Sequence, residues 1–194
     1  MLYYIFYVVG YILHDIYFIL LTILGLIATF FGGKWSFKTL MAKSIASFKI
    51  SETESEIEIK KPGKYSICIL GAGLIENLND SSFTLINKNN NKKIPLKELL
   101  IKPRFSKNMK LGIELIEFSI LDPGNFILTI KDYDKLKAKS SQLFLKNLTS
   151  PNIEINTTTI IVRETQSLIK KIGAIILLVL GVNASAWGFI LIFF

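Results

Sequence analysis

The sequence Lys60–Leu70, KKPGKYSICIL, returns in outline sixty-one residues later as Leu121–Ile130, LDPGNFILTI. Aligning residues 56–69 with 117–130 places Pro62-Gly63 on Pro123-Gly124 and Tyr65 on Phe126. Apolar residues alternate on both sides of each Pro-Gly pair, which is the period of a half-buried strand. We therefore expect two corresponding corners, each built as strand, turn, strand.

The Pro-Gly pair also predicts how the chain turns. Pro followed by Gly favours a type II turn, because proline presets φ and glycine takes positive φ without cost. In a tight hairpin that turn would splay the strands, whose twist matches the primed turn types. Each corner is therefore expected to cross from one sheet to another, with the aromatic residue filling the end of the core.

The residues around the corners are mainly β in pattern. Short alternating runs follow one another between Gly, Pro, Asn and Ser clusters at a spacing of about 8 to 12 residues, as in sandwiches and barrels. We predict an antiparallel β-sandwich or barrel-like domain over residues 47–165, with a strand at 141–147 and short helices at 96–100 and 133–139.

Both ends of the chain are apolar. Residues 1–33 contain one acid, Asp15, and no Lys or Arg, and residues 172–194 contain no charged side chain. Because about 20 apolar residues cross the hydrocarbon layer, we expect a transmembrane helix at each end. The predicted segments are an N-terminal transmembrane helix at 1–33, a linker at 34–46, the β-sandwich domain at 47–165 and a C-terminal transmembrane helix at 168–194.

Two arrangements of the first helix fit the sequence. One tilted helix from about residue 2 to residue 32 is preferred, and the alternative is a break near His14-Asp15 with residues 1–13 in the membrane interface. The first ten residues carry no positive side chain, so we expect a retained span rather than a cleaved signal peptide.

The charges between the spans predict their orientation. All 23 basic and 14 of the 15 acidic side chains lie between residues 34 and 171, which gives this segment a net charge of about +9. Lysines such as Lys34, Lys38, Lys170 and Lys171 flank the spans only on this side. The positive-inside rule then predicts a multi-pass protein of the bacterial inner (cytoplasmic) membrane, with the middle domain in the cytoplasm.

Small residues recur at helical spacing in both spans. Membrane helices associate through such residues and through interhelical hydrogen bonds. The predicted helix–helix packing residues are Thr22, Gly25, Thr29, Gly181, Asn183, Ser185 and Gly188. If the two spans are antiparallel and Gly33 lies at the same depth as Ile172, equal rise along both helices places Thr22 near Asn183. These faces pack the two spans within one chain, or they join several copies or a separate membrane subunit.

The middle domain is rich in lysine. Lys97, Lys102, Arg104 and Lys107 could bind an anionic small molecule, or they could belong to a solvated surface beside anionic lipid headgroups. The aromatic residues of this domain alternate into strands rather than forming a stacking platform, so no nucleic-acid binding is expected.

Histidine and cysteine are scarce. One His, in the first span, and one Cys, Cys68, cannot form a His/Cys metal cluster or the usual Ser-His or Cys-His nucleophile pair in the middle domain. We therefore expect no enzyme, no cofactor and no metal site.

Three features occur in this order along the chain: the repeated P-G-x-[YF]-x-[IL]-x-I corner, with the polar stretch NKNNNKKIPL at 87–96 between its two copies, and the small-residue C-terminal span. In this combination the chain resembles a loosely defined class of uncharacterised bacterial membrane proteins. That resemblance implies a β-sandwich held between two membrane helices, and no site residues. The leading functional hypothesis is a non-catalytic subunit or scaffold of a membrane assembly, whose β-sandwich binds a partner. The expected partners of the chain are the lipid bilayer and a membrane protein or further copies of itself.

Two other functions stay open. A signal-gated membrane effector would sense an anionic molecule through the basic cluster, and in layout it would resemble bacterial anti-phage effectors that place a β-barrel beside two membrane helices. A membrane immunity protein that occupies a toxin is the third hypothesis.

Overall fold

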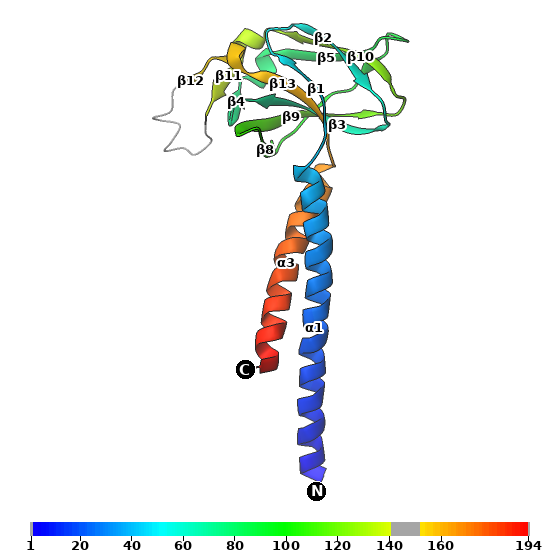
Figure 1. Cartoon of the computed structure of the whole chain (residues 1–194), viewed down its shortest axis with the longest axis vertical. Coiled ribbons are helices and arrows are strands. Elements are labelled where there is room, and N and C mark those ends of the chain that lie inside the picture. Colours follow the sequence, from blue (N-terminus) through cyan, green and yellow to red (C-terminus); the bar gives the residue numbers. More distant parts are fainter. Residues whose placement is uncertain (1, 141–151, 194) are drawn as a thin grey trace. The chain divides into compact units, whose positions relative to one another are not determined.

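The structure, a computed structural model, describes residues 2–140 and 152–193, which form a helical unit and a β unit (Figure 1). The helical unit contains α1, Leu2–Leu40, and α3, Leu168–Phe193. The β unit covers Ala42–Thr165. Each helix contains a segment long and apolar enough to cross a membrane, His14–Thr39 in α1 and Leu168–Ile192 in α3. The predicted strand at 141–147 lies outside the described residues.

Helix α1 is longer than expected. It continues through His14 and Asp15 and ends at Leu40, so the alternative with a break near residue 14 is not found. The segment 34–40 contains no Gly or Pro to end the helix, and the Met41 amide still donates to the Phe37 carbonyl at 2.9 Å. The connection expected over 34–46 therefore shortens to residues 41–43.

The β unit consists of three antiparallel sheets (Figure 1). The six-stranded sheet has the order β1-β13-β3-β9-β7, with β8 also paired to β9, and the four-stranded sheet has the order β2-β10-β5-β6. The third sheet has the order β12-β11-β4.

The strand bounds of the six-stranded sheet are β1 Ser44–Lys49, β13 Thr159–Glu164, β3 Gly63–Leu70, β9 Lys110–Ile120, β7 Lys97–Glu98 and β8 Arg104–Lys107. Those of the four-stranded sheet are β2 Glu54–Ile59, β10 Gly124–Lys131, β5 Ser82–Asn87 and β6 Lys93–Ile94. The third sheet contains β12 Asn152–Ile153, β11 Lys137–Lys139 and β4 Leu74–Glu76, and the 3-10 turns are η1 Leu78–Asp80, η2 Tyr133–Lys135 and η3 Ile155–Thr157.

Both Pro-Gly corners cross between sheets, as the sequence predicts. The first leads from β2 in the four-stranded sheet to β3 in the six-stranded sheet, and the second leads back from β9 to β10. The corners interlock, because Gly63 pairs with Ile120 and Gly124 pairs with Ile59. Each half of one corner is thus hydrogen-bonded to the opposite half of the other.

The predicted type II turn is wrong at both corners. Gly71, with φ of 101°, is the one glycine of the described chain with positive φ, so Gly63 and Gly124 lie outside the left-handed region. Each is the first residue of a strand and is paired with its neighbour at once, which requires extended backbone.

The core lies between the two larger sheets. Alternate residues of the corner strands are fully buried, among them Ile57, Ile67 and Leu128. Tyr65 and Phe126, the two corner aromatics, are 2% and 1% exposed and belong to the same hydrophobic cluster. Tyr65 stacks on Phe118 at 5.8 Å between ring centroids. The expected fold class, a β-sandwich between two terminal helices, is therefore confirmed.

The two short helices expected inside the domain are not α-helices. Residues 96–100 contain strand β7, and residues 133–139 contain the 3-10 turn η2 followed by strand β11. Both segments are too short for helix nucleation to be favourable on its own, and pairing with β9 and with β4 and β12 decides their conformation.

Candidate functional site

The predicted small-residue faces of α1 and α3 meet within one chain. A Cβ atom on Gly181 would lie 2.5 Å from the Thr29 backbone nitrogen, and one on Gly25 would lie 2.5 Å from the Ser185 backbone nitrogen. Gly188 is in equally close contact with Thr22. The helix backbones approach so closely only because these positions carry no side chain.

The hydroxyl groups of this face bond to their own helices. Thr22, Thr29 and Ser185 each donate to the carbonyl four residues earlier, at 2.8 Å. The close contact between backbones, rather than an interhelical hydrogen bond from these three residues, therefore holds the pair together.

The predicted contact between Thr22 and Asn183 is wrong. Thr22 lies against Gly188, more than one helical turn further along α3, because α1 continues past Gly33 to Leu40 and shifts the register. Asn183 is two positions from Gly181, about 200° around the helix, so it lies on the face away from α1. It is exposed, and its amide donates to the Val179 carbonyl at 2.8 Å.

The four predicted anion-binding side chains do not converge on one point. Lys97 pairs in register with Glu117, whereas Lys107 pairs with Lys110, seven residues along β9 and about 20 Å of strand away. Lys102 forms an ion pair with Glu98 at 2.8 Å, and Lys107 donates to the Ser44 hydroxyl at 2.7 Å. Arg104 is exposed on β8. The anionic-ligand site stays a prediction, and the separation of these four side chains adds no support to it.

The hairpin of β8 and the first part of β9 folds back over the six-stranded sheet. In the strand order, three strands separate β8 from β1, and neighbouring strands of a flat sheet lie about 4.8 Å apart. Yet Lys107 of β8 reaches Ser44 of β1, and the Arg163 guanidinium carbon lies 4.2 Å from the centroid of the Phe105 ring. We call residues 104–112 the flap, and the sheet face that it covers, opposite the sandwich core, the outer face.

The flap buries apolar side chains on the outer face. Phe105 packs in one cluster with Cys68 and Ile161. The ring lies against Gly112, where a Cβ atom would be 2.5 Å away. Cys68 is fully buried in this cluster, so the sequence expectation of a small buried residue holds.

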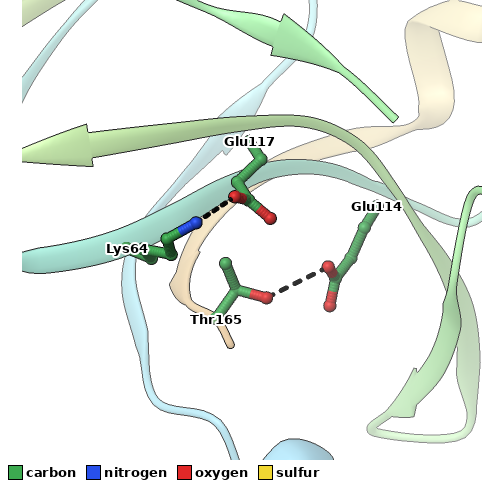
Figure 2. Close-up of polar contacts among 4 residues, drawn as sticks. All are labelled: Lys64, Glu114, Glu117 and Thr165. Carbon is green, nitrogen blue, oxygen red and sulfur yellow. Dashed lines mark hydrogen bonds and ion pairs between the residues drawn. The ribbon is translucent and has the colours of Figure 1, made fainter. Parts of the chain in front are cut away.

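Polar residues line up across the outer face. Lys64 donates to Glu117 at 2.8 Å, and the Thr165 hydroxyl donates to Glu114 at 3.2 Å (Figure 2). Glu114 and Arg163 are each 3% exposed, which is rare for charged side chains. Within residues 2–140 and 152–193, no group of three or more His, Cys, Asp and Glu could hold a metal ion.

A groove of about 440 Å³ lies between β1 and β2. Its lining is Lys43, Ser44, Ile45, Ala46, Glu56, Ile57, Glu58, Lys60, Lys61, Tyr65 and Glu164. These strands are the edges of the six-stranded and the four-stranded sheets. An edge strand presents backbone groups that its own sheet does not pair. The groove is large enough for several side chains of a bound segment.

Tyr65 is the aromatic residue in the lining of the groove. Its hydroxyl donates to the Lys61 carbonyl at 2.6 Å. Burial, together with the negative charge of Glu164, raises the pKa of Tyr65 above its ordinary value. The hydroxyl therefore stays protonated at neutral pH and keeps the corner loop in place.

The flap and the groove were missed by sequence reasoning. The available signal for the flap was the Lys107-Asn108-Met109-Lys110 turn between two alternating runs, since Asn tolerates the left-handed conformation. The groove gives no local signal, because its two edge strands become neighbours only through the sheet order. No protein-family model matches the chain, and no curated protein matches its sequence.

Opening the flap should expose the single cysteine. We expect Phe105→Ala to raise the maleimide labelling rate of Cys68 in native conditions by about tenfold or more, because local opening then costs less free energy. Labelling is followed by mass spectrometry on the full chain in detergent. Leu100→Ala removes a side chain that is 100% exposed and should leave the rate unchanged. Equal rates in the two variants would show that Phe105 does not cover the thiol.

Proposed function

We propose that this chain is a non-catalytic, two-span protein of the bacterial inner membrane, whose cytoplasmic β-sandwich binds a protein partner at the groove between β1 and β2. It acts as a subunit or scaffold of a membrane assembly. The two apolar helices and the lysines on the domain side of both spans support this topology.

The groove is the observation that carries the proposal. It joins the edges of both larger sheets, and a bound segment in extended conformation can pair with an edge strand while its alternate side chains enter the groove. Ser44 of the lining is four residues from the last residue of α1.

The charges of the groove fit a selective contact. Glu56 pairs with Lys88 at 3.0 Å and Glu58 with Lys60 at 3.4 Å, all with exposed side chains. Such pairs contribute little to stability, but their arrangement selects a partner with a complementary pattern.

A further contact is proposed within the bilayer. The small-residue faces are occupied by the α1–α3 pair, which leaves Asn183 as a polar side chain on the lipid-facing side of α3. Asn in a membrane helix associates with polar groups of neighbouring helices. A membrane subunit or a second copy is therefore proposed to contact α3 here.

Charge reversal in the groove should weaken partner binding. A photo-cross-linking amino acid at Ala46, in cells, is expected to give a discrete adduct with the partner. In Glu56→Lys/Glu58→Lys the yield should fall about tenfold, because the reversed charges no longer complement the charge pattern of the bound segment.

The matched control is Glu98→Lys/Glu154→Lys, which changes the net charge equally at two exposed sites outside the groove. It should keep the adduct. A chain that gives no adduct at Ala46 and purifies only as a lone monomer in mild detergent would refute the proposed function.

A further inference from the structure

The tip of the flap, Lys107–Leu111, has an unusual conformation for its residues. Asn108 and Met109 form a two-residue turn between the paired Lys107 and Lys110, with φ of 50° and 62°. Both values are positive, as a type I′ hairpin turn requires, and a Met in this region is uncommon. Met109 is 100% exposed, so the fold presents an apolar side chain at the end of the hairpin without covering it.

Two lysines flank this apolar tip. Lys107 and Lys110 pair with each other across the turn, and residues 102–110 contain no acid. Leu111, which is 47% exposed, adds apolar surface beside Met109. Apolar side chains among lysines match the interface of an anionic bilayer, where the chains enter the headgroup region and the ammonium groups contact phosphates.

The tip is held close to the chain's connection with α1. The Lys107 ammonium donates to the Ser44 hydroxyl at 2.7 Å, and three residues connect Ser44 to Leu40, the end of α1. Four steps of extended chain reach at most about 14 Å. An ammonium has three donors, so Lys107 can bond Ser44 and a lipid phosphate together.

We propose that the flap tip docks on the anionic membrane surface, with Met109 and Leu111 in the headgroup layer and Lys107 and Lys110 on lipid phosphates. The inference rests on the proposed function in that α1 and α3 must span the bilayer. The short connection raises the effective concentration of lipid at the tip, so a weak contact of a few side chains suffices.

The test uses the full chain reconstituted in vesicles. An environment-sensitive fluorophore is attached through Ser106→Cys in a Cys68→Ser background, since Ser106 is exposed on β8 two residues before Asn108. The vesicles contain phosphatidylcholine with phosphatidylglycerol, or phosphatidylcholine alone, each with a headgroup nitroxide lipid. We expect quenching with phosphatidylglycerol, and about tenfold less docking without the anionic lipid or in Lys107→Gln/Lys110→Gln.

A matched pair of substitutions locates the contact. Met109→Asp should remove the quenching, whereas Leu100→Asp should retain it, because Leu100 is equally exposed but precedes β8 at the end opposite the tip. Quenching that ignores lipid charge, or that is the same in both variants, would overturn the proposal. A signal that follows protein density rather than nitroxide lipid would assign the tip to a second copy and overturn it too.

Flotation of the same vesicles after carbonate washing separates this inference from the proposed function. Retained chains without quenching refute the docking of the tip alone. Chains released by carbonate refute the membrane spans themselves.

Discussion

Replacing Gly181 with leucine should force α1 and α3 apart. A Cβ atom at this position would lie 2.5 Å from the Thr29 backbone nitrogen and 2.8 Å from the Gly25 carbonyl oxygen. Backbone atoms cannot rotate away as a side chain can, so the helices must separate toward the interaxial distance of about 8–10 Å of helices with larger contact residues. We expect a loss of about 1–3 kcal/mol or more in the stability of the pair.

The separation can be measured between spin labels at Leu26 and Val182, which are both exposed, in a Cys68→Ser background. Gly173→Leu, on the same helix, is the matched control, because a Cβ atom on Gly173 would meet no atom within 4 Å. It should leave the distance distribution unchanged. An unchanged distribution in Gly181→Leu would mean that the two helices do not pack through this face in the membrane.

The corners could be predicted because their signal is local. Pro62-Gly63 and Pro123-Gly124 lie between alternating runs. An unprimed turn does not match the twist of two paired strands, so a tight hairpin is disfavoured and a crossing between sheets is expected. The turn type was wrong because glycine enters a sheet ladder at once, and that pairing depends on the other corner.

The helix faces show the same limit. Spacing of three and four residues is a property of each helix, so the glycines that meet were found from the sequence. The register of α1 against α3 was not found, because it depends on where α1 ends, and no residue in 34–40 marks that end.

The flap could not be derived from any single segment. Its fold-back rests on contacts of Phe105 with Arg163 and of Lys107 with Ser44, and the sequence separates these partners by 58 and 63 residues. The basic cluster is dispersed because β7 and β8 pair with different parts of β9, Lys97 with Glu117 and Lys107 with Lys110. Arg104 and Lys107 are three residues apart on β8 and point to opposite faces, and Lys102 and Lys107 pair with different neighbours.

Removing the Phe126 ring should cost the β unit about 3–5 kcal/mol, since the ring is 1% exposed and fills the core at the interlocked corners. That is a large share of the about 5–15 kcal/mol by which domains are stable. The loss in Phe126→Ala can be measured by the urea concentration at which Cys68 becomes accessible to a maleimide. Cys68 is the single cysteine and lies outside the Phe126 cluster. Local opening of the flap exposes little surface and gives labelling that depends weakly on urea, so the steep urea-dependent rise in labelling reports unfolding of the domain.

Phe83→Ala provides the comparison. Phe83 packs against the same cluster from β5 but is only partly buried, so removal of an identical ring should cost less than half as much. Equal shifts for the two variants would show that ring removal, rather than the corner position, determines the loss. A small shift in Phe126→Ala alone would mean that the paired strands hold the corners without the aromatic side chain, and that the repeated aromatic is dispensable for the sandwich.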